Sequence, residues 1–278
     1  MGEKKIFKNP EYYTNREMSW VLFNYRVLSE ARDKNIPLFE RLKFLSITAS
    51  NLDEFFMIRV ASLKDMVSAG YTKRDIAGMT VSEQLHGLEE QIHELVELQY
   101  STYNRSLLPL LEQNGLHVIK KQEQLTEKEG EYLDKYFESN VYPVLTPMAV
   151  DSSRPFPLIR NKSLNLGALV KKKEGGGELE FATVQVPSVL PRIVELPDDK
   201  GKRRVILLEE IIERNIHKLF LNYDIVCVYP FRIMRNADLT IEEDEAADLL
   251  KEIEKQLKKR QWGVASRVVV EAGIDKGL

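Results

Sequence analysis

The chain has a single cysteine, Cys227, so it contains no pair of thiols that could close an internal disulfide. Cysteine usage of this kind is typical of proteins in a reducing compartment. No uninterrupted apolar run approaches the ~20 residues that a membrane-spanning helix needs. The first residues also lack the apolar segment of a secretory signal. We therefore expect a cytoplasmic protein without a membrane span.

Net charge is also small: 40 Lys and Arg residues against 43 Asp and Glu residues give −3. This balance argues against a surface built as a whole to hold nucleic acid, and we expect no nucleic-acid partner. Two common catalytic motifs are absent, the Gly-x-Ser-x-Gly elbow and the Gly-x-x-x-x-Gly-Lys-Ser/Thr phosphate loop. With 278 residues, 43% of them hydrophobic, the chain is long enough for two domains with their own cores.

Helical periodicity dominates residues 1–115, for which we predict an all-α helical bundle. Helix starts are expected near Thr14 or Asn15, at Pro37, after a polar break at Ser50-Asn51, and at a capping box from Thr80 to Glu83. We expect these helices to end near Gly70 and Gly115, with a kink before Pro109. The apolar stripes predicted to face the core are Trp20, Phe23, Val27 and Ala31; Leu38, Leu42, Leu45 and Ala49; Leu52, Phe56, Val60, Leu63 and Val67; and Leu85, Leu88, Ile92, Leu95, Gln99 and Tyr103.

Residues 116–278 mix strand and helix signals, and for them we predict an α+β domain with a largely antiparallel sheet. A capping box from Thr126 to Glu129 opens one helix, and further helices are expected over 207–220 and 241–259. Strands are expected over 164–170, 181–186, 225–233 and 264–270, and the glycine-rich segment 174–178 is typical of a hairpin turn between the first two.

Two histidines, two basic clusters and one asparagine each allow two interpretations. His86 and His93 lie two turns apart on one predicted helix, which suits a metal site less well than a solvated face. The clusters Lys171–Lys173 and Lys200–Arg204 are typical of solvated loops, and contact with a polyanion is the alternative. Asn51, placed at a predicted helix start, suits an N-cap; alternatively its amide donor and acceptor suit the edge of a purine.

The sequence resembles the bacterial polyphosphate kinases in a set of motifs that follow the order of that family. Its first part carries Glu17-Met18-Ser19-Trp20, Phe23-Asn24-Tyr25-Arg26-Val27-Leu28, Pro37-Leu38-Phe39-Glu40-Arg41-Leu42 and Asn51-Leu52-Asp53-Glu54-Phe55. Its second part carries Val141-Tyr142-Pro143-Val144-Leu145-Thr146-Pro147, Pro155-Phe156-Pro157, and Phe231-Arg232 followed by Asn236-Ala237-Asp238-Leu239. The resemblance identifies 1–115 as the family's N-terminal helical domain and 116–278 as its head domain.

The resemblance implies a transferase that reversibly moves the terminal phosphate of ATP onto inorganic polyphosphate through a phosphohistidine, with Mg²⁺. It further implies a homodimer, with a dimer contact in the head domain. In this family the Asn of the Asn-Leu-Asp-Glu-Phe motif contacts the ATP base, which gives Asn51 a nucleotide-binding role. On this ground the purine interpretation of Asn51 is favoured over the cap, although the two do not exclude each other.

One departure from the family limits what the resemblance implies. The family continues with two phospholipase-D-like catalytic domains that carry the nucleophilic His, whereas this sequence stops at Leu278 and has no His-x-Lys motif. We therefore expect an N-terminal portion of the enzyme that is inactive alone, with no catalytic residue and no Mg²⁺ ligand in this chain. The alternatives are a stand-alone dimerisation or interaction module and a polyanion-binding module.

Overall fold

The computed structural model describes residues 7–120, 124–150, 156–173, 178–197, 201, 203–238 and 263–278. Contacts divide the chain into two compact units. The first comprises Met1–Leu110 together with Met234–Arg267, and the second comprises Leu111–Ile233 together with Val268–Leu278. The predicted domain division at residue 115 stays a prediction.

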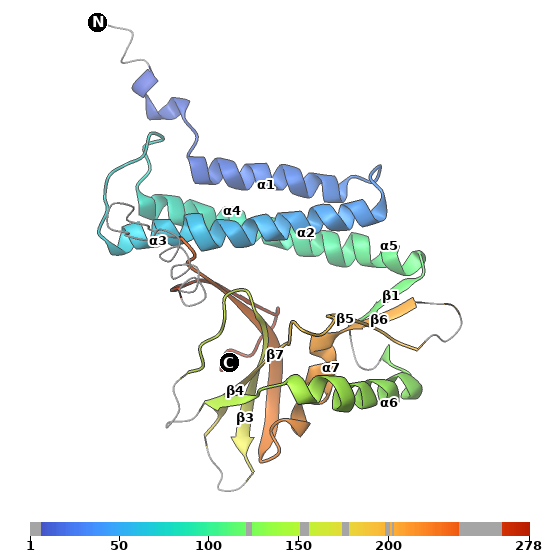
Figure 1. The fold of residues 1–278 in the computed structure, drawn as a ribbon. Coiled ribbons are helices and arrows are strands. Elements are labelled where there is room, and N and C mark those ends of the chain that lie inside the picture. The colour runs from blue at the N-terminus through green and yellow to red at the C-terminus, as the bar shows by residue number, and fades with distance from the viewer. Residues whose placement is uncertain are drawn as a thin grey trace, which may run out of the picture. The chain divides into compact units, whose positions relative to one another are not determined.

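The first unit is a bundle of long helices, and Figure 1 shows α1, α2 and α4 lying side by side. Its helices are α1 (Arg16–Arg32), α2 (Leu38–Phe55), a π-helical turn (Phe56–Val60), α3 (Ala61–Ser68), α4 (Val81–Thr102) and a second π-helical turn (Tyr103–Leu107). Helix α5 (Leu108–Gln113) then carries the chain into the second unit.

Cap chemistry places the starts of α1 and α4 where the sequence predicts them. The Asn15 side chain accepts hydrogen bonds from the backbone N–H groups of Glu17 and Met18, and Thr80 and Glu83 form a reciprocal capping box. At the other ends Gly70 and Gly115 have φ angles of 71° and 82°, which glycine adopts without strain. A π-helical turn at Tyr103–Leu107 lies just before Pro109, where the kink is expected, and the kink itself stays a prediction.

Two of the predicted apolar stripes are wrong in part, because polar side chains hold positions on the buried faces. In α1 the buried stripe is Glu17, Val21, Asn24, Leu28 and Ala31, whereas Phe23 is 45% exposed. In α2 the buried residues are Arg41, Thr48, Leu52, Asp53 and Phe55, whereas Ala49 is exposed. These polar groups find partners inside the bundle; for example, the buried Arg41 donates from Nε to the Ala31 carbonyl oxygen at 2.9 Å.

The predicted break at Ser50-Asn51 is also wrong, because α2 runs through both residues. Helix α2 continues through the π-helical turn into α3, so the chain is helical without interruption from Leu38 to Ser68. Among the contacts of the π-helical turn is a hydrogen bond of 2.8 Å from the backbone N–H of Ala237 to the carbonyl oxygen of Met57. A tertiary contact therefore accompanies the change of helical register that the periodicity did not reveal.

The second unit has the α+β organisation that the sequence predicts, with helix α6 (Glu127–Tyr136), a π-helical turn (Phe137–Val141) and helix α7 (Leu208–Arg214). One sheet has the order β1-β6-β5, formed by β1 (Leu116–Ile119), β6 (Arg203–Leu207) and β5 (Ile193–Glu195). The other has the order β2-β4-β3-β7-β8, formed by β2 (Met148–Val150), β4 (Glu180–Gln185), β3 (Leu164–Lys172), β7 (Tyr223–Arg235) and β8 (Ala265–Val270). Only the β1–β6 pair has a parallel register among the pairs whose register the described residues define.

The core of the second unit lies where α6 and α7 pack against these strands. Leu133 and Phe137, which follow the Thr126–Glu129 capping box, are fully buried in one cluster with Leu166, Val184 and Ile211. The helix predicted over 207–220 is shorter than expected, since α7 ends at Arg214 and a 3₁₀ turn follows at Ile216–Lys218. The short strands β1, β2 and β5 carried no clear alternation and were not predicted.

Several predictions fall on residues outside those the structure describes. They are the glycines at 175–177, the helix expected over 241–259 with its capping box, Lys200, Lys202, Pro155 and Leu239. The strands on either side of the predicted hairpin turn, β3 and β4, are antiparallel neighbours.

Candidate functional site

A cavity of about 400 Å³ lies in the first unit, between the first turns of α1 and the continuous helical segment α2–α3. All of its lining residues fall between positions 16 and 66. Its volume is within the range of small-molecule sites, roughly 300–1,000 Å³. The site is therefore built by one unit alone.

Aromatic side chains form one part of the wall. Trp20 from α1 and Phe55 from α2 are stacked, with their ring centroids 4.1 Å apart and their planes 10° from parallel. Phe23, which the sequence placed in the core, instead lines the cavity with a partly exposed ring, and the Arg26 guanidinium lies 5.7 Å from the centre of that ring. Flat apolar surfaces of this kind suit a planar ring system.

Asn51 lies in the interior of α2 and lines the same cavity with a half-buried side chain. Its Nδ2 donates to Oδ1 of Asn24 on α1 at 3.2 Å. The cap interpretation is wrong because α2 begins thirteen residues earlier, at Leu38. Within the described residues its Oδ1 has no protein donor, so this acceptor and one N–H remain for another molecule.

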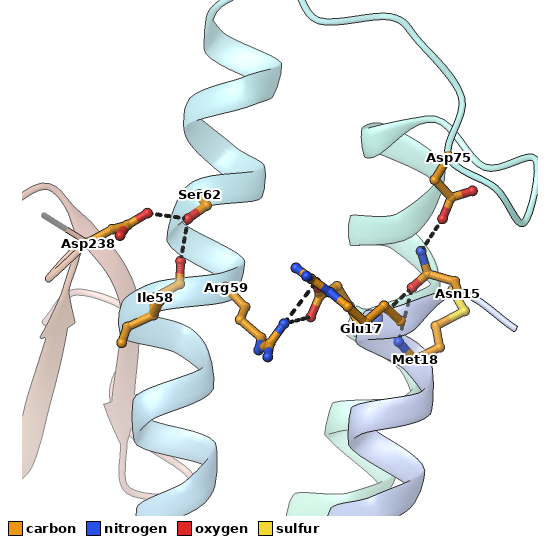
Figure 2. A network of polar contacts seen from close by, with 9 residues as sticks. Asn15, Glu17, Met18, Ile58, Arg59, Ser62, Asp75 and Asp238 are labelled. Carbon is orange, nitrogen blue, oxygen red and sulfur yellow. Dashed lines mark hydrogen bonds and ion pairs between the residues drawn. The ribbon is translucent and has the colours of Figure 1, made fainter. Parts of the chain in front are cut away.

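Charged side chains from α1 and from the α2–α3 segment line the cavity. The buried Glu17 carboxylate accepts from Arg16 at 2.7 Å and from Arg59 at 3.2 Å, as Figure 2 shows for Arg59. Arg59 belongs to the π-helical turn and therefore ties that turn to the start of α1. Glu54, exposed on α2, brings the formal charge of these four groups to zero.

Residues 236–238 hold the α3 side of the site in place. Ser62 Oγ lies 2.7 Å from the Ile58 carbonyl oxygen and 2.6 Å from Asp238 Oδ2, so its single hydrogen serves one of them (Figure 2). Asn236 Nδ2 donates to Asp65 at 2.7 Å. Together with the bond from Ala237 to Met57, these contacts fix the helical segment that carries Arg59 and Ser62.

In the described part of the chain, no cluster of three or more His, Cys, Asp or Glu side chains could hold a metal ion. His86 and His93 are both exposed, and Nδ1 of His93 lies 3.0 Å from the carbonyl oxygen of Glu89 on the same helix. The described residues therefore bring no set of Mg²⁺ ligands together, and the location of the Mg²⁺ site stays a prediction.

The two basic clusters are engaged in local contacts where the structure describes them. Lys173 donates to the Leu221 carbonyl oxygen at 3.0 Å, and three ion pairs involve Lys172 with Glu180, Arg203 with Glu195, and Arg204 with Glu129. A polyanion would have to displace these partners. These contacts favour the interpretation of the two basic clusters as solvated loops over that of a polyanion site.

Trp20, Phe55 and Arg59 line the cavity but were not predicted as site residues. The expected break at Ser50-Asn51 placed Asn51 at the start of a helix, where Phe55, Arg59 and Ser62 follow it at spacings of four, four and three. That spacing places them on one face of a helix, and it was the signal in the sequence that could have found them.

None of the helices that the structure describes is long and apolar enough to cross a lipid bilayer. This observation concerns the described helices only.

Comparison with known proteins gives matches along nearly the whole chain. Residues 13–119 match the family model "Polyphosphate kinase N-terminal domain", and residues 128–278 match "Polyphosphate kinase middle domain". Polyphosphate kinase from Halalkalibacterium halodurans is 52% identical over 266 residues, which are 95% of this chain and 38% of that protein. The enzyme from Lactiplantibacillus plantarum is 50% identical over 265 residues, covering 95% of this chain and 36% of its own.

A solved structure is similar as well. The crystal structure of polyphosphate kinase from Porphyromonas gingivalis matches with a TM-score of 0.72 and 28% identity, over 89% of this chain and 38% of that one. The chain thus spans less than two-fifths of the length of the relatives it matches.

Proposed function

Because this chain belongs to the polyphosphate kinase family, we propose that it forms the adenine-binding side of an enzyme that transfers the terminal phosphate of ATP to inorganic polyphosphate. The single observation that carries the proposal is the cavity of the first unit, into which Asn51 presents an unengaged amide oxygen and one N–H. ATP, ADP and polyphosphate are the proposed ligands of the whole enzyme, which we place in the cytoplasm.

The chemistry of the cavity fits an adenine ring. An asparagine amide pairs with adenine by accepting from the six-amino group and donating to the neighbouring ring nitrogen. Trp20, supported by Phe55 behind it, offers a flat surface to the ring, and Phe23 offers a second apolar surface. Stacking of a base on an aromatic side chain is worth on the order of 1–3 kcal/mol.

Phosphoryl transfer itself requires groups that the described residues do not assemble. A covalent route needs a nucleophile with an activating base, and the transferred phosphate needs several cationic donors aimed at one point. Arg16 and Arg59 share the carboxylate of Glu17. We therefore assign the chain to nucleotide positioning and expect the chemical step to depend on a further part of the enzyme. We also propose that the head domain forms a homodimer.

The test is an assay of phosphate transfer from ATP to polyphosphate with the folded chain and Mg²⁺, first alone and then with a separately prepared C-terminal part of a polyphosphate kinase. We expect no turnover alone and turnover in the mixture. In the mixture, Asn51→Ala should lower kcat/KM for ATP by roughly 10- to 100-fold, the range expected for a lost base contact.

Ser50→Ala is the matched control, because Ser50 neighbours Asn51 on α2 but is exposed and does not line the cavity. It should leave kcat/KM unchanged. Turnover by the chain alone would contradict the assignment of the chemical step elsewhere, and full activity of the Asn51→Ala mixture would contradict the adenine contact.

A further inference from the structure

Asn24 is a fully buried polar residue in the middle of α1, next to the cavity wall. A buried amide is costly unless its donors and acceptor are satisfied. Nδ2 of Asn24 donates to the Thr48 carbonyl oxygen at 3.1 Å, and Oδ1 of Asn24 accepts from Nδ2 of Asn51 at 3.2 Å. The first of these partners, the Thr48 carbonyl oxygen, can only accept a hydrogen bond.

The backbone partner determines which way both amides point. If the Asn24 amide were rotated by 180°, its oxygen would face the Thr48 carbonyl oxygen and its NH₂ group would face the NH₂ group of Asn51. Each of these two contacts would bring like groups together, oxygen against oxygen and NH₂ against NH₂. The observed orientation of the Asn24 amide is therefore the one that the fold permits. Asn51 must then turn its Nδ2 toward Asn24 and leave its oxygen for the cavity.

We propose that Asn24 is a positioning residue that locks the Asn51 amide in one orientation and thereby makes this site select six-amino purines over six-oxo purines. The inference rests on the proposed function, because it assumes that Asn51 contacts the base. We place the contact at the edge that carries N1, where adenine offers a donor at its six-amino group and an acceptor at N1, which match the locked amide. Guanine and hypoxanthine offer an acceptor at O6 and a donor at N1, which match only the rotated amide.

The experiment compares kcat/KM for ATP and GTP in the mixture of this chain with the C-terminal part. Asn24→Leu keeps the branching at Cγ but cannot hydrogen-bond, so the Asn51 amide becomes free to rotate. We expect the ATP/GTP ratio of the wild-type chain to fall at least 10-fold in Asn24→Leu, through both a loss for ATP and a gain for GTP. Asn24→Ala should shift the ratio in the same direction.

Thr102→Val provides the matched control for a lost buried polar group. Thr102 is buried in the same unit and donates to the Leu98 carbonyl oxygen at 2.7 Å, but it does not line the cavity. Its substitution can lower stability, whereas the ATP/GTP ratio should stay at the wild-type value. A purely structural role of Asn24 would leave the ratio unchanged in the same way.

A second measurement compares three nucleotides with the wild-type chain, so it does not depend on the folding of a variant. In the wild-type mixture we expect the order ATP, then purine riboside triphosphate, then inosine triphosphate, because the last presents O6 to the Asn51 oxygen. A higher rate with inosine triphosphate than with purine riboside triphosphate would contradict the proposal that Asn24 fixes the orientation of the Asn51 amide.

The outcomes separate the two proposals. No transfer from any nucleotide by the wild-type mixture, or an unchanged ATP rate in Asn51→Ala, would overturn the proposed function and this inference with it. A loss in Asn51→Ala combined with an unchanged ATP/GTP ratio in both Asn24 variants would overturn this inference alone.

Discussion

Among single residues, Glu210 on α7 has a carboxyl group whose environment opposes its charge. Burial, with the nearby carboxylates of Glu213, Glu209 and Glu271, raises the pKa of Glu210 to about 7. Burial also raises the pKa of Glu213, with a further contribution from Glu271. The folded chain therefore holds protons that the unfolded chain releases near pH 4.5.

The sign of the effect on stability follows from this difference. The contribution of protonated Glu210 is complete below the unfolded pKa, near 4.5, and is lost as the pH rises to about 7. We predict that Glu210→Gln, which stays neutral, is more stable than the wild type at pH 8 by on the order of 1 kcal/mol, because solvent partly screens this half-exposed group, and equal to it at about pH 3.5. Urea unfolding at the two pH values measures the difference.

Glu131→Gln serves as the control, since it removes an exposed carboxylate of α6 and should leave the pH dependence as it is. An equal response of the two variants at pH 8 would contradict the prediction.

Residue patterns predicted those features that depend on local chemistry. Asn15, Thr80 and Thr126 were identified because an N-cap bonds to backbone groups two or three positions away. Asn24 and Arg41 were not, because their partners lie on other helices, at Thr48 and Ala31. Asn51 was predicted for its amide chemistry and the family resemblance, and it does line the cavity, but the aromatic wall beside it depends on which helices pack together.

Among the elements, the π-helical turn Phe56–Val60 lies in the middle of the helical segment that lines the cavity. Asn51 and Phe55 precede this turn, Arg59 lies within it and Ser62 follows it. The predicted break at Ser50-Asn51 lies before the turn, and the predicted stripe from Leu52 to Val67 runs through it, so periodicity did not reveal the change of helical register. The bond from Ala237 to the Met57 carbonyl oxygen comes from a part of the sequence 180 residues away, which no local pattern reveals.

We predict that Ala237→Pro destabilises the first unit, because proline has no N–H to donate to Met57. Loss of the donor leaves a carbonyl oxygen without this partner, at a cost of about 1–3 kcal/mol. Ala237→Gly removes the methyl group and keeps the N–H. Thermal unfolding of both variants measures the effect, and Ala237→Pro should melt several degrees below Ala237→Gly.

Faster amide hydrogen exchange of residues 56–60 in Ala237→Pro would locate the effect at the π-helical turn. Equal melting temperatures for the proline and glycine variants would show that the N–H of Ala237 contributes nothing to the stability of the turn.

For the whole molecule, sequence order predicted the succession of a helical bundle and an α+β region. It did not reveal that the first compact unit also takes in residues 234–267. Such discontinuous packing depends on contacts such as Lys64 Nζ to the Ser266 carbonyl oxygen at 2.8 Å, between residues 202 positions apart. Composition and periodicity report on neighbours along the chain, so contacts at this separation lie outside what they predict.

The homodimer proposed for the head domain is also a property of the whole molecule. Among the described strands β8 lies at one end of the five-stranded order, and its Val268 and Val270 are 56% and 45% exposed. An edge strand with exposed apolar side chains can pair with another chain, and burying such side chains favours association. We predict that the 32.2 kDa chain sediments at twice that mass at micromolar concentration.

Lysine at both positions of β8 should shift the sedimentation equilibrium to the monomer, because each charge would have to leave water in the dimer. Val226→Lys is the matched control: Val226 is also 56% exposed, but it lies on β7, inside the sheet order, and the variant should remain dimeric. A wild-type chain that stays monomeric would contradict the homodimer of this chain. A dimer that survives both lysines on β8 would place the contact elsewhere in the head domain and leave the edge strand without a role in association.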